Sequence, residues 1–270
     1  MSAEGSGRGS EVASAGRGRL IFTVTTGRSG TNLLQQMFDL LDDVVAEHEP
    51  EPKFSRVLRD VQRRPEAARE WLERVKLPAI AAVAGRVYVE TSHLCGKGFL
   101  EPLLGCGVVP DLVILRRQAR AVARSLFQLG TIPARTETGR NFLLQPDDPG
   151  VLPVPGWADL HDYQLCYWYC LEMERRARLY PEMVRARGGR VSEVTFAELL
   201  TDGFPRIVRE LDLESTVGAD FLDRLTQARS TRVNDKADLK HLQSRVVPDN
   251  LDALEADVRA RVGVDADFAA

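Results

Sequence analysis

Short apolar segments alternate along the chain with segments whose apolar residues recur at helical spacing. Residues 20–24, 86–90 and 111–115 are rich in β-branched and aromatic residues, which predicts three buried strands. Residues 190–195 predict one more strand of the same kind. Apolar strands that alternate with helices are typical of a parallel sheet that is covered on both faces. We therefore expect an α/β protein with three α/β/α layers around a central parallel sheet.

Helices are predicted between these strands. The first follows the first strand and carries apolar residues at helical spacing, namely Leu33, Leu34, Met37, Phe38 and Leu41. The charged segment 53–77 is also expected to be helical, with a buried stripe. That stripe consists of Leu58, Val61, Trp71, Leu72 and Val75. Further helices are expected over 100–104 and over 164–180. Another is expected to begin at residue 196 or 197, followed by a pair of helices that ends at about residue 228.

Two segments have a composition unlike the rest of the chain. Residues 1–18 are mainly Gly, Ser, Ala and Arg, which bury too little apolar surface to offset the entropy of ordering, so we expect a disordered leader. Residues 131–157 are rich in Pro, Gly and Asp and are too long for an ordinary connection, which indicates a functional loop. The length prior favours a single domain over the remaining residues, 19–270.

Composition and charge exclude several partners. The net charge of −3 provides no overall basic field, so neither nucleic acid nor an anionic membrane is expected as a partner. No apolar run is long enough to span a bilayer, and we expect a cytoplasmic protein. The four cysteines form no CxxC pair and the four histidines are scattered, which predicts buried thiols and no metal site.

The turn after the first strand carries the first chemical signal. Residues 25–32 (TTGRSGTN) join that strand to the first helix, where free backbone N–H groups and the helix dipole favour an anion. Gly27 and Gly30 allow the backbone close to the anion, Arg28 adds a charge, and the Ser29 and Thr31 hydroxyls are further donors. The glycine spacing is too short for a Walker-type ATP loop. An ordinary helix start with a Ser or Thr N-cap is the alternative.

This turn resembles the 5′-phosphosulfate loop of sulfotransferases that use 3′-phosphoadenosine-5′-phosphosulfate (PAPS). The resemblance implies a P-loop nucleotide-hydrolase-like fold, no metal cofactor, and binding of PAPS and its product PAP. It implies cofactor contacts from the loop residues Thr26, Gly27, Arg28, Ser29, Gly30, Thr31 and Asn32. Cytosolic aryl and steroid sulfotransferases carry Lys at the place of Arg28. The Arg resembles the tyrosylprotein, carbohydrate and bacterial branches of the family.

The second motif follows the strand 111–115. In the family, an Arg at the end of this strand and a Ser eight residues later bind the 3′-phosphate, and here Arg117 and Ser125 have that spacing. The family's Asn-Pro after the Arg is replaced by Gln118 and Ala119. A solvated, arginine-rich helix start is the alternative interpretation. Two anion sites separated by one nucleoside would discriminate PAPS from a simple phosphate ester.

Two further segments resemble the family more loosely. Phe196 replaces the Tyr of a segment that lies near the adenine, which implies a contact with the base. Arg232, Asn234 and Lys236 lie where the family closes a basic loop over the 3′-phosphate, and we take Arg232 and Lys236 as candidate cofactor contacts. A solvated charged loop is the alternative for these residues.

Sulfuryl transfer needs a base for the acceptor proton and positive charge for the leaving group. Arg28 suits the second role. Glu49 is the first candidate base, because its spacing from Arg28 resembles that in tyrosylprotein sulfotransferases. His93 is the second, because residues 90–94 resemble the Lys-Thr-His-Leu of cytosolic members, with Glu90 at the place of the Lys. His48 is a candidate for orienting either group or the acceptor.

The sequence therefore predicts a sulfotransferase that acts on a hydroxyl of a small molecule, carbohydrate or specialised metabolite. Tyr167, Trp168 and Tyr169 are expected to pack in the core, with an aromatic acceptor pocket as the alternative. The loop 131–157 is the candidate for selecting the acceptor. A small-molecule kinase with a divergent phosphate loop is one rival. A nucleotide-binding protein of the same fold without turnover is the other.

Overall fold

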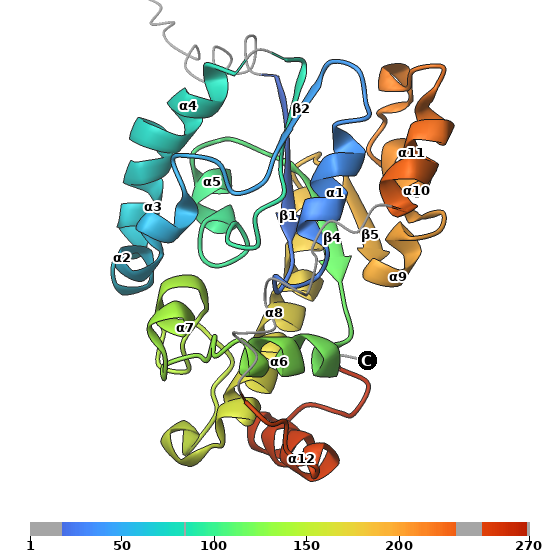
Figure 1. The fold of residues 1–270 in the computed structure, drawn as a ribbon. Helices are drawn as coiled ribbons and strands as arrows, with labels where there is room; N and C mark the ends of the chain where they lie inside the picture. Colours follow the sequence, from blue (N-terminus) through green and yellow to red (C-terminus); the bar gives the residue numbers. More distant parts are fainter. Residues whose placement is uncertain (1–17, 84, 231–244, 269–270) are drawn as a thin grey trace, which may run out of the picture.

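The computed structural model describes residues 18–83, 85–230 and 245–268, which fold around a five-stranded parallel sheet (Figure 1). The strands are β1 (Arg19–Val24), β2 (Val44–Glu47), β3 (Val87–Glu90), β4 (Asp111–Arg116) and β5 (Val191–Thr195). Their order across the sheet is β2-β3-β1-β4-β5, and every neighbouring pair is parallel. The α/β class and the parallel sheet that the sequence predicts are confirmed.

Helices lie on both faces of this sheet. They are α1 (Thr31–Phe38), α2 (Leu58–Arg63), α3 (Pro65–Trp71), α4 (Leu77–Ala81), α5 (Leu100–Gly105), α6 (Ala119–Gln128), α7 (Glu137–Phe142), α8 (Asp162–Arg185), α9 (Phe196–Leu199), α10 (Gly203–Glu210), α11 (Phe221–Ser230) and α12 (Leu251–Val262). Successive residues of β1 point to opposite faces. Ile21 packs with α1, α10 and α11, whereas Phe22 packs with the helices of the other face.

The strand order places the turn after β1 where the chain changes direction. The connection after β1 leads toward β2 and β3 on one side, while β4 lies on the other side of β1. Loops diverge at such a point and leave a crevice at the carboxyl edge of the sheet. The turn 25–32 and the residues after β3 and β4 therefore meet at one edge.

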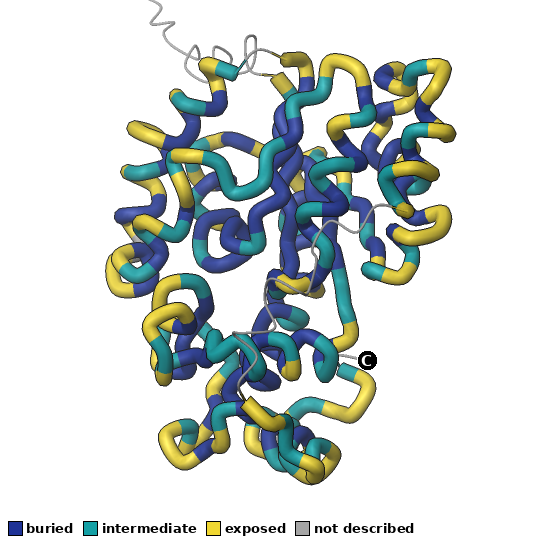
Figure 2. The backbone as a smooth tube through the Cα atoms, viewed as in Figure 1, coloured by how far each residue is buried: buried dark blue, intermediate teal, exposed yellow. Residues whose placement is uncertain are grey.

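Burial follows the layers, with buried strands in the centre and exposed outer helix surfaces (Figure 2). The predicted burial of the stripe in 53–77 is confirmed for Leu58, Val61 and Leu72. The prediction for Val75 is wrong, because 41% of its surface is exposed. Residues Leu72–Lys76 form a π-helical turn. The wider turn rotates the next side chains, so that Lys76 points inward at 1% exposure in place of Val75.

Three elements were not anticipated. The edge strand β2 is only four residues long and mostly half-buried, so it lacks the apolar run that identifies the other strands. Helix α12 packs against α8, and α7 lies inside the predicted loop 131–157. The predicted leader 1–18 lies outside the described residues except for Gly18, so its disorder stays a prediction, as does the single-domain assignment.

The remaining composition-based expectations concern side chains and membranes. Cys95, Cys166 and Cys170 are buried, but Cys106 is only half-buried, which corrects the expectation for that thiol. Within the described ranges, no group of three or more His, Cys, Asp or Glu side chains is placed to hold a metal ion. No helix among those residues is long and apolar enough to cross a membrane.

Candidate functional site

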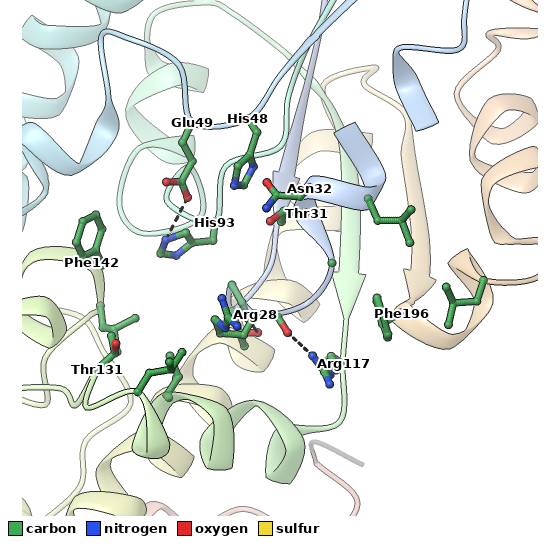
Figure 3. Close-up of a pocket in the computed structure, with 18 of the residues that line it drawn as sticks. Arg28, Thr31, Asn32, His48, Glu49, His93, Arg117, Thr131, Phe142 and Phe196 are labelled. Carbon is green, nitrogen blue, oxygen red and sulfur yellow. Dashed lines mark hydrogen bonds and ion pairs between the residues drawn. The ribbon is translucent and has the colours of Figure 1, made fainter. Parts of the chain in front are cut away.

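A cavity of about 710 Å³ opens at the carboxyl edge of β1, β3 and β4 (Figure 3). Most of the site residues that the sequence predicts line it. They are Thr26, Gly27, Arg28, Gly30, Thr31, Asn32, His48, Glu49, His93, Arg117 and Phe196. Ser29 and Ser125 do not line it, and Arg232 and Lys236 lie outside the described residues. Segments far apart in the sequence thus converge on one cavity.

The turn after β1 requires its glycines. Gly27, Arg28 and Gly30 have φ values of 80°, 55° and 96°, in the left-handed region. A Cβ at Gly30 would lie 2.5 Å from the Phe196 ring, and one at Gly27 would lie 3.1 Å from the His93 ring. Gly30 is the N-cap of α1 and no side chain caps the helix. An ordinary Ser or Thr cap is therefore excluded, and the first N–H groups of α1 are left for another acceptor.

The Ser29 side chain holds the turn together and does not face the cavity. It is fully buried, and its hydroxyl lies 2.7 Å from Thr25 Oγ1, 2.9 Å from Thr26 Oγ1 and 2.9 Å from Gly27 O. Our prediction that this hydroxyl donates to the anion does not fit this geometry, because its bonds are used inside the turn. Tyr169 Oη also donates to Thr26 O at 2.6 Å, so a buried tyrosine of α8 stabilises the turn.

Arg28 and Arg117 bring the two predicted anion motifs into contact. Arg117 Nη1 donates to the Arg28 carbonyl at 2.7 Å, and Arg28 Nε donates to Ser125 Oγ at 3.3 Å. Neither guanidinium forms an ion pair with a carboxylate of the described chain, whereas the neighbouring Arg116 binds Glu174 and Glu193. Burial and the charge of Arg117 lower the pKa of Arg28. Two cations without counter-charges favour a bound anion.

The two candidate bases contact each other. Glu49 Oε1 lies 3.3 Å from His93 Nε2, and both side chains are mostly buried. Glu49 has φ 49°, which is uncommon for a residue other than Gly, and such backbone strain is frequent at functional sites. Burial, followed by the charges of Lys97, His48 and Arg28, holds the pKa of His93 well below its usual value. The imidazole is therefore neutral near pH 7.

His48 stands on the same wall of the cavity. Its Nδ1 lies 2.9 Å from the carbonyl oxygen of Thr91, which can only accept a hydrogen bond. In the neutral ring, Nδ1 therefore carries the proton and Nε2 has the lone pair. His48 is thus a second possible proton acceptor beside Glu49, as well as an orienting group.

The two ends of the cavity differ in chemistry. Figure 3 shows Thr131 and Phe142 on the Glu49–His93 side. The apolar side chains of Leu126, Leu129 and Leu143 also line the cavity. Figure 3 shows Phe196 at the opposite end, beyond Arg117. There Leu33, Leu200 and Arg229 complete the lining, and the Arg117 guanidinium lies 5.1 Å from the centre of the Phe196 ring.

The comparisons with known proteins concern the fold. No protein-family model matches the chain, and no curated protein matches it. The solved sulfotransferase domain from the curacin biosynthetic pathway does match, with 12% identity and a TM-score of 0.50. The match covers 92% of this chain and 98% of that domain. The chain has a sulfotransferase fold.

Two further solved structures show a weaker likeness. The sulfotransferase domain of the Synechococcus PCC 7002 olefin synthase is 15% identical, with a TM-score of 0.49 over 96% of this chain and 99% of that domain. Mouse sulfotransferase SULT7A1 in complex with PAP is 11% identical, with a TM-score of 0.49 over 93% of this chain and 86% of that one. What this chain does with its sulfotransferase fold follows from its own residues.

Three side chains around the cavity were not anticipated from the sequence. Arg229 of α11 lines the cavity, and its buried Nη2 has no hydrogen-bond partner among the residues described. Tyr169 donates a hydrogen bond to the turn 25–32, a role that the sequence did not indicate. The prediction that Tyr167, Trp168 and Tyr169 pack in the core is confirmed. Lys97 Nζ contacts His93 Nδ1. None of the three belongs to a motif, and only their position in the sulfotransferase fold reveals them.

Glu90 occupies the place of the family's Lys but does not line the cavity. It is fully buried at the end of β3, where it binds Lys76 Nζ at 2.7 Å and accepts from Tyr88 Oη at 3.2 Å. Its second oxygen has no partner among the described residues. Burial, opposed by Lys76, raises the pKa of Glu90 to about 7.

We expect Glu90→Gln to remove a pH dependence of stability. Between pH 4.5 and about 7, folded Glu90 keeps a proton that the unfolded chain has lost. The folded state then binds more protons, so the free energy of unfolding falls as pH rises through this range. Denaturant unfolding at a series of pH values measures the slope. The double variant Lys76→Met/Glu90→Gln, which removes both charges, should lose the same component, and an unchanged slope in both variants would contradict the assignment.

Proposed function

We propose that this protein transfers the sulfuryl group of PAPS to a hydroxyl group of a small molecule. The observation that carries the proposal is the pair of guanidinium groups, Arg28 and Arg117, that lie without counter-charges beside an uncapped helix terminus and a carboxylate–imidazole pair. An anion is expected at the first two, and a proton acceptor stands next to it.

The residues of the cavity fit an adenosine bisphosphate with two separate anionic groups. The N-terminus of α1 and Arg28 would hold the 5′-phosphosulfate. Arg117 and Arg229, which both line the cavity, would hold the 3′-phosphate, and the apolar surface of Leu33, Phe196 and Leu200 suits the adenine. Ser125 would act through Arg28, because its hydroxyl oxygen accepts a hydrogen bond from Arg28 Nε.

The bound donor supplies a sulfuryl group on a phosphate leaving group. Glu49 accepts the proton of the acceptor hydroxyl as its oxygen forms a bond to sulfur. The bond between sulfur and the bridging phosphate oxygen breaks, and Arg28 stabilises the negative charge that develops there. The products are the sulfate ester, PAP and a proton. His93 holds Glu49 in place, and His48 is the alternative acceptor of the proton.

The wall beside Glu49 favours acceptors with an apolar body. Leu126, Leu129, Phe142 and Leu143 offer little hydrogen bonding to a sugar, whose several hydroxyl groups would lose water without replacement. Among the acceptors that the sequence leaves open, a hydroxylated small metabolite therefore fits better than a carbohydrate. A cytoplasmic location stays a prediction.

The test is to measure PAP binding by calorimetry and then transfer from labelled PAPS to an acceptor library. We expect PAP to bind with a 1:1 stoichiometry, ATP to compete poorly, and apolar alcohols or phenols to be sulfonated. Absence of PAP binding would reject the proposal. ATP-dependent phosphorylation without sulfonation would establish the kinase, and tight PAP binding without transfer to any acceptor would establish a binding protein.

A further inference from the structure

Lys97 is a fully buried lysine below the cavity. Its side chain has no solvent exposure, and it lies in the segment between β3 and α5, four residues after His93. Its Nζ stands 5.0 Å from the centre of the Tyr169 ring, the same tyrosine that supports the phosphate turn. No ion pair compensates Lys97 within the described chain, although Glu49 is near enough to favour its charge. Burying an amine in this way is costly unless its hydrogen bonds are satisfied.

The amine makes two short hydrogen bonds. Lys97 Nζ lies 2.6 Å from the carbonyl oxygen of Phe142 and 2.6 Å from His93 Nδ1. The carbonyl can only accept, so Lys97 donates there. Burial, with smaller contributions from Arg59 and Arg176, holds the pKa of Lys97 well below its usual value. Even a neutral amine has two N–H groups, which suffices for both contacts.

The direction of the second bond follows from the other side of the imidazole. An ionised Glu49 carboxylate has only lone pairs to present, and its Oε1 lies 3.3 Å from His93 Nε2. A lone pair on Nε2 would face that oxygen, so this close contact favours a proton on Nε2. A neutral imidazole with a proton on Nε2 has its lone pair on Nδ1. Lys97 therefore donates to Nδ1, and the two contacts favour the same tautomer.

We propose that Lys97 is a positioning residue that holds His93 as the Nε2–H tautomer, so that the imidazole donates to Glu49 and leaves Glu49 as the base. This inference rests on the proposed function. It removes His93 as a proton acceptor, because the only lone pair of the ring is bonded to Lys97 and points away from the carboxylate. Lys97 itself does not line the cavity.

The contact with Phe142 extends this role to the acceptor wall. Phe142 ends α7 and lines the cavity, and its ring centre lies 6.5 Å from that of His93. The Lys97 amine thus contacts both the loop 131–157, through Phe142, and the His93 imidazole next to Glu49. The loop position and the orientation of Glu49 are coupled through Lys97.

The first test needs no variant and no turnover. Two-dimensional NMR of the full-length protein labelled with ¹⁵N-histidine reports which ring nitrogen carries the proton. We expect the His93 signals, assigned with His93→Gln, to show an unprotonated Nδ1 and a protonated Nε2 at pH 7, with or without PAP. An Nδ1–H tautomer or an imidazolium would overturn the proposal, even if the protein proved not to transfer sulfate.

The second test is Lys97→Met, which keeps the length of the side chain and removes the donor. We expect kcat to fall by about 10–100-fold, as for other groups that orient a histidine, with KM for PAPS and PAP affinity unchanged within about twofold. In a His93→Gln background the same substitution should have no further effect on kcat, because Lys97 acts through His93. An unchanged kcat, an additive loss in the double variant, or loss of PAP binding would each overturn the proposal.

Lys76→Met is the matched control. Lys76 is the second fully buried lysine, 1% exposed, and it binds Glu90 and the Pro52 carbonyl away from the cavity. The same substitution there should lower the Tm but leave the His93 tautomer and kcat unchanged. A changed tautomer in this control would show that loss of any buried lysine disturbs His93, which would also overturn the specific role of Lys97.

Discussion

Arg28→Ala is expected to lower sulfuryl transfer by about 10²–10³-fold, the usual effect of removing one strong electrostatic donor from an active site. Among residues 25–32, Arg28 alone carries a charge, and it lines the cavity. No carboxylate in the described chain forms an ion pair with it. Its backbone already has a left-handed conformation, and its carbonyl, which accepts from Arg117, survives the substitution. The protein should therefore stay folded while kcat falls.

The measurements are kcat with labelled PAPS, the Kd of PAP and the Tm. Arg28→Lys separates charge from geometry, because it keeps the positive charge and loses the planar donor fork. Arg124→Ala is the control, since Arg124 is exposed on α6 beside Ser125 and its loss removes one charge outside the cavity. Turnover of Arg28→Ala within a few-fold of the wild type would reject the role of Arg28.

Glu49→Gln is expected to lower kcat by about 10²–10⁴-fold, the range for loss of a general base. Gln has the same shape, and its amide oxygen can still accept from His93 Nε2, so the wall of the cavity should not change. PAP affinity should stay near that of the wild type, because Glu49 is not a ligand for either anionic group. A loss of kcat without a loss of binding is the signature of the missing proton acceptor.

Glu51→Gln is the control for this substitution. Glu51 lies in the same proline-rich segment, but it is exposed and forms its ion pair with Arg56 at 2.7 Å. It should transfer sulfate at the wild-type rate. His48→Gln completes the comparison, since a large loss there together with a small loss in Glu49→Gln would assign the proton to His48 Nε2 in place of Glu49.

The central strands and the phosphate turn were predictable because their signals are local. The apolar runs of β1, β3 and β4 lose contact with water on both sides only in a sheet that is covered on both faces. The glycines at 27 and 30 permit positive φ values that few other residues adopt. The edge strand β2 escaped prediction, because a strand of four residues with one buried position gives only a weak pattern.

The candidate site depends on contacts between distant segments, and no local pattern encodes them. Glu49 and His93 were rival candidates in the sequence, yet β2 and β3 are adjacent in the sheet and bring the two side chains together. Arg229 and Lys97 belong to no motif, and their roles follow from where α11 and the segment before α5 pack.

The turn 25–32 depends both on local sequence and on tertiary contacts. Its residue types alone predict an anion site after a strand, because backbone conformation and helix polarity depend on neighbours in the chain. Packing decides that Ser29 bonds inside the turn, that Tyr169 supports it, and that Arg117 and Ser125 reach Arg28. Side-chain direction at a site depends on the whole fold, since each of these partners comes from another part of the chain.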